Sequence, residues 1–111
     1  TQNNRLIRQI YDYIDQNSQY YDLSVNSISV TFQMSPAAVS KLFKRETNTG
    51  LLDYINQVRV RHARELLSTQ AYSVSQVTEM VGYTNTSSFI RIFKKYEGIS
   101  PGMVKQNTYN S

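Results

Sequence analysis

The side chains of this sequence that can take part in chemistry are chiefly cations, and they fall in two similar groups. The chain carries twelve Lys and Arg against eight Asp and Glu, a formal net charge of +4. The first group is Lys41, Lys44 and Arg45, and the second, fifty residues later, is Arg91, Lys94 and Lys95. Ammonium and guanidinium groups bind anions, and the planar guanidinium can hold guanine O6 and N7 at once. These residue types therefore favour binding of a polyanion.

Catalytic chemistry has little support in the sequence. There is no cysteine and His62 is the only histidine, so neither a thiolate site nor a multi-histidine metal site is available. Asp12 and Asp15 lie three residues apart on an expected helix, which is a common spacing for surface carboxylates. No nucleophile motif and no Gly-rich phosphate loop occurs. We therefore expect no enzyme activity, no metal and no cofactor.

No apolar run approaches the roughly 18 residues that a membrane-spanning helix requires. The segment Thr1–Asn4 is polar and has neither an initiating Met nor a signal-peptide core. Together with the absence of cysteine, these features favour the cytoplasm and no membrane partner. We also expect an upstream sensor or dimerisation domain, because the chain begins like an internal segment of a longer protein.

The elements that must position the two cation groups are helices. Apolar residues recur at steps of three and four, without strand-like alternation. Ser24, Ser35, Ser73 and Asn85 are N-cap candidates, because their side chains can accept hydrogen bonds from free helix amides. The expected helices cover about 5–16, 25–32, 36–48, 51–67, 74–81, 86–97 and 101–106, with 107–111 frayed. The predicted fold class is all-α with seven helices.

The sequence contains an internal repeat. Capping, apolar and basic positions recur at offsets of 49 and then 50, as in Ser24/Ser73, Ile28/Val77, Val39/Phe89, Lys41/Arg91 and Phe43/Phe93. Each copy is a short helix, a tight turn and a capped helix with an apolar inner face and a basic outer face. This is the helix-turn-helix plan, in which the second helix enters the major groove of DNA. The alternative is a generic helical bundle with accidental similarity.

The helix expected at about 51–67 forms a rod of roughly 25 Å. Grooves on one face of B-DNA recur about every 34 Å, so the rod is compatible with two reading helices in successive grooves. We therefore divide the chain into a first helix-turn-helix subdomain (1–50), a linker helix (51–68) and a second subdomain (69–111).

Three stretches resemble the AraC/XylS family of regulators, over about Leu23 to Val104. They are Met34-Ser35-Pro36 with Leu42-Phe43-Lys44; Arg59-Val60-Arg61 with Ala63 and Glu65-Leu66-Leu67; and Val81-Gly82-Tyr83 with Phe93-Lys94-Lys95-Tyr96, Gly98 and Ser100-Pro101. The resemblance implies two helix-turn-helix subdomains joined by a linker helix. It also implies promoter binding as a transcription factor and, usually, contact with RNA polymerase.

The sequence departs from the family pattern at several positions. Gln33 stands in the first turn, where the family commonly has Gly. Because a non-Gly residue with positive φ is strained, we expect a less regular first turn. Ser29 and Thr78 stand where the family often has Ala, and Thr86 stands where it often has Pro.

Residues near the start of each reading helix reach base edges best. The residues expected to contact bases are Ala37, Ser40 and Lys41 in the first helix, and Thr86, Ser87, Ile90 and Arg91 in the second. Ala37 suits a thymine methyl, and Lys41 or Arg91 suits guanine. Ile90 also suits a thymine methyl, although an incidental surface isoleucine is an equal alternative.

Phosphate contacts are expected from a second set of residues, namely Lys44, Arg45, Lys94 and Lys95, and from the helix starts at Ser24 and Ser73. For each lysine alone, an ordinary solvated charge is the alternative. Among the linker arginines, Arg61 can pair with Glu65 four residues on. We therefore favour structural pairing over DNA contact for the arginines of this helix, and we read His62 as a surface or packing residue.

Taken together, the sequence predicts specific binding of double-stranded DNA by the reading domain of a bacterial transcription regulator. The main alternative is a protein-binding module, and the two matching cationic faces argue against it. RNA binding is less favoured, because no aromatic-bearing sheet and no Gly-x-x-Gly clamp is visible.

Overall fold

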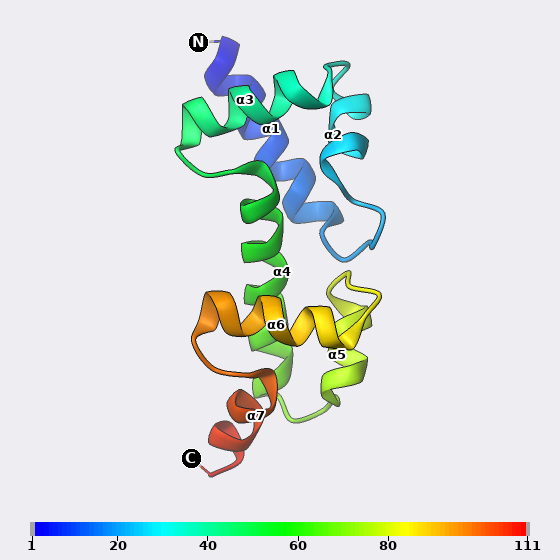
Figure 1. Ribbon diagram of the computed structural model, residues 1–111, viewed down its shortest axis with the longest axis vertical. Coiled ribbons are helices and arrows are strands. Elements are labelled where there is room, and N and C mark those ends of the chain that lie inside the picture. The colour runs from blue at the N-terminus through cyan, green and yellow to red at the C-terminus, as the bar shows by residue number, and fades with distance from the viewer. Residues whose placement is uncertain (1, 111) are drawn as a thin grey trace.

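Figure 1 shows the computed structural model of the protein, which describes residues 2–110 as seven helices without a strand. The helices are α1 (Gln2–Asn17), α2 (Val25–Thr31), α3 (Pro36–Thr47), α4 (Leu51–Ser68), α5 (Val74–Met80), α6 (Thr86–Glu97) and α7 (Pro101–Asn110). The all-α prediction is confirmed. The prediction that 107–111 is frayed is wrong for residues 107–110, which continue α7, and Ser111 lies outside the described residues.

Four helices begin at the polar residues that were predicted to cap them. Each cap side chain accepts a hydrogen bond from the backbone N–H three residues on, in the pairs Ser24/Ser27, Ser35/Ala38, Ser73/Gln76 and Asn85/Ser88. The second helix of each pair also ends alike, with Asn48 (φ 59°) and Gly98 (φ 80°) in the left-handed conformation. Local sequence therefore sets the bounds of both reading helices.

The turns between the paired helices close with equivalent hydrogen bonds. The Met34 N–H donates to Ser29 O at 2.9 Å. The Tyr83 N–H donates to Thr78 O at 3.0 Å. Gln33 adopts φ 57°, at the position where the second turn has a glycine. The expectation of a less regular first turn is therefore wrong, because Gln33 takes up the left-handed conformation despite its strain.

The hydrophobic core consists of two clusters that share α4. In the first cluster, α1, α2 and α3 surround the N-terminal half of α4, which contributes Leu51, Ile55 and Val58. In the second cluster, α5, α6 and α7 surround the C-terminal half, which contributes residues from Val60 to Leu67. A single 18-residue helix is thus part of both halves of the core.

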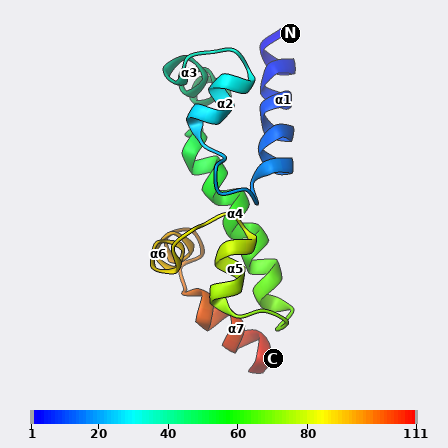
Figure 2. The ribbon, with the colours of Figure 1, turned by 90° about the vertical axis from the view of Figure 1, so that its right-hand side faces the viewer.

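The molecule is elongated, measuring 48 × 22 × 20 Å, and α4 follows its long axis. Both α3 and α6 cross in front of this axis and run in the same direction, from right to left in Figure 1. In Figure 2 both are seen end-on at the left, while α1 lies toward the right. Equivalent helices of the repeat therefore lie on one side of the molecule. No helix within residues 2–110 is both long and apolar enough to cross a membrane.

Candidate nucleic-acid interface

The outward face of α3 carries the residues predicted to read the first half of a binding site. Val39, Leu42 and Phe43 are buried in the first cluster. Their spacing turns the other positions outward, and Ala37, Lys41, Lys44 and Arg45 are exposed while Ser40 is half-buried. All five lie on one helix, so the local fold alone brings them together.

The outward face of α6 is built in the same way. Phe89 and Phe93 are fully buried and Ile92 is half-buried against the second cluster. The exposed residues are Ser87, Ile90, Arg91, Lys94 and Lys95, and Thr86 is half-buried. Ile90 is 38% exposed, so its side chain is not part of the core.

Lys41 and Arg91 occupy equivalent positions, each six residues after its N-cap, Ser35 or Asn85. The buried positions on the two helices also correspond. Because α3 and α6 run in the same direction on one side of the molecule, the two outward faces are displayed together (Figures 1 and 2). The tertiary structure thus assembles one surface from two segments fifty residues apart.

Most of these cationic side chains have few or no partners within the chain. Among the described residues, no hydrogen bond or ion pair engages the side chain of Lys41, Arg91 or Lys94. Lys44 Nζ lies 3.4 Å from the Asn48 carbonyl oxygen, at the long end for a hydrogen bond. Lys95 Nζ lies 5.4 Å from the ring centre of Tyr96. The charges are therefore available to an external anion.

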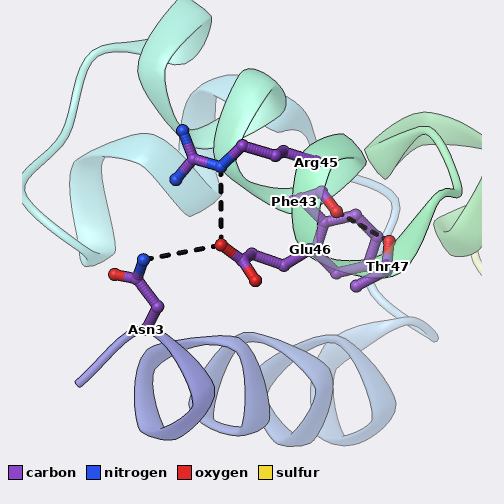
Figure 3. Close-up of polar contacts among 5 residues, drawn as sticks. All are labelled: Asn3, Phe43, Arg45, Glu46 and Thr47. Carbon is purple, nitrogen blue, oxygen red and sulfur yellow. Dashed lines mark hydrogen bonds and ion pairs between the residues drawn. The ribbon is translucent and has the colours of Figure 1, made fainter. Parts of the chain in front are cut away.

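Arg45 has an acidic neighbour. Its Nε lies 3.4 Å from Glu46 Oε1, and Asn3 Nδ2 donates to the same oxygen at 3.4 Å (Figure 3). Figure 3 shows that the Arg45 contact is made through Nε and not through the two terminal nitrogens. The Arg45 side chain is 61% exposed, so this ion pair contributes little stability. Glu46 will nevertheless oppose a phosphate at this end of α3.

The helix starts at Ser24 and Ser73 are largely satisfied from within the chain. The Ser24 N–H donates to Ser27 Oγ at 2.9 Å, and the Ser73 N–H donates to Gln76 Oε1 at 2.8 Å. The hydroxyl oxygens of both serines accept the reciprocal bonds of these capping boxes. Only the hydroxyl hydrogens and the next two amides of each helix are left for an anion, so phosphate contact at these serines stays a prediction.

Arg59 has a role that the sequence analysis understated. Its side chain is buried, at 7% exposure, and it bonds to backbone carbonyls rather than to a carboxylate. The sequence contained a signal for this burial, because Arg59 lies four residues after Ile55 and four before Ala63, on the apolar face of the helix. Burial lowers the pKa of the guanidinium.

The other polar residues of α4 face outward or are partly covered. The ion pairs of the described residues are Arg45–Glu46 and Arg64–Glu97 at 2.8 Å, so the expected pair of Arg61 with Glu65 is wrong. His62 is half-buried, with Nδ1 3.5 Å from Ser18 Oγ, as a packing residue would be.

Known proteins share both the sequence pattern and the fold. Residues 28–107 match the family described as helix-turn-helix domain. The Msm operon regulatory protein of Streptococcus mutans is 32% identical over 95 residues, covering 85% of this chain and 34% of that protein. The C-terminal domain of AraT, a response regulator from Geobacillus stearothermophilus, has a TM-score of 0.87 at 27% identity, covering 91% of this chain and 84% of that domain.

The DNA-binding domain of AdpA, a global transcriptional factor solved with a target DNA, has the same fold. Its TM-score is 0.83 at 21% identity, covering 91% of this chain and 90% of that chain. The family match extends from within α2 to within α7, and it therefore includes most of both helix pairs and all of α4. It places the chain among DNA-binding regulators and not among enzymes. The chain belongs to the AraC-type helix-turn-helix family and is the DNA-binding domain of a transcription regulator.

Proposed function

We propose that this domain reads a two-part site on double-stranded DNA, with α3 and α6 in successive major grooves. The observation that carries the proposal is the shared direction and shared side of α3 and α6, each with exposed cations in the same register. The 18 residues of α4 span about 27 Å, and α3 packs near its N-terminal end. A rod of this length is compatible with two reading helices that follow the roughly 34 Å repeat of the groove.

The chain then divides into two reading subdomains, 1–50 and 69–111, joined by the linker helix 51–68. In the first, Ala37, Ser40 and Lys41 contact bases, and in the second Thr86, Ser87, Ile90 and Arg91 do so. Among these residues, Arg91 discriminates most strongly between bases, because its guanidinium can bind guanine O6 and N7 together and no other base offers that pair of acceptors in the major groove.

Phosphate contacts in this proposal hold the domain in register on the duplex. They come from Lys44, Arg45, Lys94 and Lys95, with the starts of α2 and α5 at Ser24 and Ser73 as further donors. These contacts carry no sequence information of their own. They supply the part of the affinity that all DNA sequences share and that depends on salt.

The regulator as a whole needs partners that lie beyond this domain. The chain spans 34% of the Msm relative's length. We propose that a sensor or dimerisation domain supplies the signal, that RNA polymerase is the target of activation, and that the protein works in the cytoplasm where bacterial DNA lies.

Selection of bound sequences from a random duplex library, followed by affinity measurements at two salt concentrations, tests the DNA-binding proposal. Neutralising four phosphates gives a log–log slope of about −3.6, so affinity falls roughly 100-fold between 50 and 200 mM salt. We expect enrichment of a two-part site and this salt dependence on both the selected and a scrambled duplex. A protein-binding module would enrich no sequence and would show no such slope.

A further inference from the structure

The two halves of the molecule touch at a junction beside α4, where the edges of the two apolar clusters approach each other at Leu23 and Tyr83. It consists of the loop 18–23 between α1 and α2, the turn at Gly82 and Tyr83 between α5 and α6, and Arg59 of α4 between them. Figures 1 and 2 both show this loop and this turn facing each other beside α4. The first belongs to the half that carries α3, and the second to the half that carries α6.

Arg59 is bonded to the first half by backbone contacts. Its Nε donates to Ser18 O at 2.8 Å, and its Nη2 lies 2.9 Å from Tyr20 O and 3.4 Å from Leu23 O. These carbonyls belong to a loop without regular structure, which has few other donors to hold it. A guanidinium presents five N–H donors in one rigid plane, so it can fix several carbonyls relative to one another.

The same guanidinium contacts the second half through an aromatic ring. Its carbon Cζ lies 5.3 Å from the ring centre of Tyr83, within the range of a cation–π contact. The Tyr83 hydroxyl donates to Asn56 Oδ1 at 2.7 Å, which fixes the ring against α4. Arg59 is therefore held between a loop of one half and a turn of the other.

Direct backbone contact completes the junction. A Cβ atom placed on Gly82 would collide with Ser18 O and would lie 2.8 Å from Arg59 Nε, closer than real Cβ atoms approach other heavy atoms. The two halves thus meet with no side chain between Gly82 and the Ser18 carbonyl. A buried charge that loses its partners is costly, so this polar network resists any rotation that separates the loop from the turn.

We propose that Arg59 is a positioning residue for two-site DNA reading: it fastens the loop 18–23 to the turn at Gly82 and Tyr83, and so fixes α3 and α6 relative to each other. The second groove contact is intramolecular because both halves share α4, and a fixed geometry raises its effective concentration when the half-site spacing matches. The fixed geometry also makes binding sensitive to half-site spacing, because each inserted base pair rotates one half-site by about 34°. The positioning claim concerns the free protein, and only its effect on spacing rests on the proposed function.

A distance measurement between spin labels tests the positioning claim without DNA. The chain contains no cysteine, so Asn26→Cys and Ser75→Cys place two labels at exposed, equivalent positions of α2 and α5. We expect one narrow distance distribution in the otherwise unchanged protein, and a distribution at least about twofold broader, or a shifted one, with Arg59→Gln. Arg64→Gln removes the same charge from the same helix but breaks a contact within the second half, and it should leave the distribution narrow.

Arg59→Lys keeps the charge and loses the planar fork, so it serves if Arg59→Gln does not fold, as judged by circular dichroism. We expect a broadened distribution with this variant too. An unchanged distribution in every folded Arg59 variant overturns the proposal. Broadening that Arg64→Gln reproduces overturns it as well, because it would show general loosening and no specific junction.

A spacing series on the selected duplex measures the consequence for DNA reading. We expect one inserted base pair between the half-sites to weaken binding by about 10-fold for the unaltered domain and by about threefold for Arg59→Gln. Binding to duplexes with one half-site should stay equal. If the unaltered domain binds no DNA, the proposed function is wrong, but the distance measurement still tests the positioning claim. If both proteins are equally sensitive to the half-site spacing, Arg59 has no role in DNA reading.

Discussion

Lys41 and Arg91 occupy equivalent positions but offer different chemistry to a base pair. Arg91 presents a planar fork that matches guanine O6 and N7, whereas Lys41 presents one compact charge on a flexible stem. The residues beside them also differ, with Ser40 and Ala37 in α3 against Ile90 and Ser87 in α6. We therefore expect α6 to contribute more of the sequence preference and α3 more of the general affinity.

Replacing Arg91 by Ala should separate these contributions. Loss of a bidentate contact costs about 1–3 kcal/mol, so Arg91→Ala should weaken binding to the selected duplex by roughly 10- to 100-fold and relax one position of the site. Lys94→Ala should weaken binding to selected and random duplexes alike and should lower the salt slope by about 0.9. Fluorescence anisotropy with both duplexes measures the two effects.

Arg5→Ala is a matched control, because Arg5 is an exposed cation on α1, and Figure 2 shows this helix toward the other side of the molecule from α3 and α6. It should leave both affinities nearly unchanged. If Arg91→Ala and Lys94→Ala act identically on the two duplexes, the division into base and phosphate contacts is wrong.

The turns inside the two helix pairs share a positive φ and equivalent hydrogen bonds, but their surroundings differ. Gln33 is exposed at φ 57°, and only the left-handed conformation itself disfavours a side chain there. Gly82 is buried at φ 110° against Ser18 of the other half. Glycine at position 82 therefore serves two purposes, the turn and the contact between halves, and position 33 has only the first.

Substitutions at positions 33 and 82 should change the stability of the fold in opposite directions. Gln33→Gly should raise the free energy of unfolding by about 0.5–1 kcal/mol, since a left-handed residue without a Cβ is not strained. Gly82→Ala should lower it by at least about 2 kcal/mol, because the added methyl is strained and also collides with the Ser18 carbonyl. Urea unfolding followed by circular dichroism measures both, and similar small effects at the two positions would contradict the assigned contact.

Across the whole molecule, tyrosine hydroxyls join helices that are far apart in the sequence. The Tyr54 hydroxyl donates to Asp15 Oδ1 at 2.9 Å, which links α4 to α1. The Tyr96 hydroxyl donates to Asp53 Oδ1 at 2.8 Å, which links α6 to the start of α4. Burial, and then the bond to the carboxylate, raises the pKa of each phenol from its ordinary value near 10 to about 12.

These raised pKa values predict a loss of stability in alkali. The neutral phenol is favoured in the folded state, so its contribution is fully present below pH 10 and disappears as the pH rises from about 10 to 12. The double variant Tyr54→Phe/Tyr96→Phe should be less stable at pH 8 but should lose stability less steeply above pH 10. Urea unfolding at pH 8, 10 and 11 gives the change in the free energy of unfolding with pH for both proteins. Lysines titrate in both proteins, so only the difference between them reports on the tyrosines. An identical pH dependence of stability in the two proteins would refute this account.

The sequence by itself determined where the helices begin and end and which of their residues are buried or exposed. Ser35-Pro36, Asn85 and Gly98 act on amides and carbonyls within a few residues, so their effect can be read locally. The repeat at offsets of 49 and 50 likewise fixed which face of each reading helix is buried. Helix α7 shows the limit, because its extension beyond the expected end accompanies bonds of Lys105 to distant residues, Tyr72 and Gln70.

Only the tertiary structure decided how the two helix pairs face each other. The carbonyl groups that accept hydrogen bonds from Arg59 lie 36 to 41 residues away in the sequence. The spacing of apolar residues along α4 does not reveal which loop carbonyls will contact this arginine. The same is true of Gly82, whose close neighbour comes from the other half of the chain. Local preferences act over a few residues, whereas the shared side of α3 and α6 arises from packing both halves on one continuous helix.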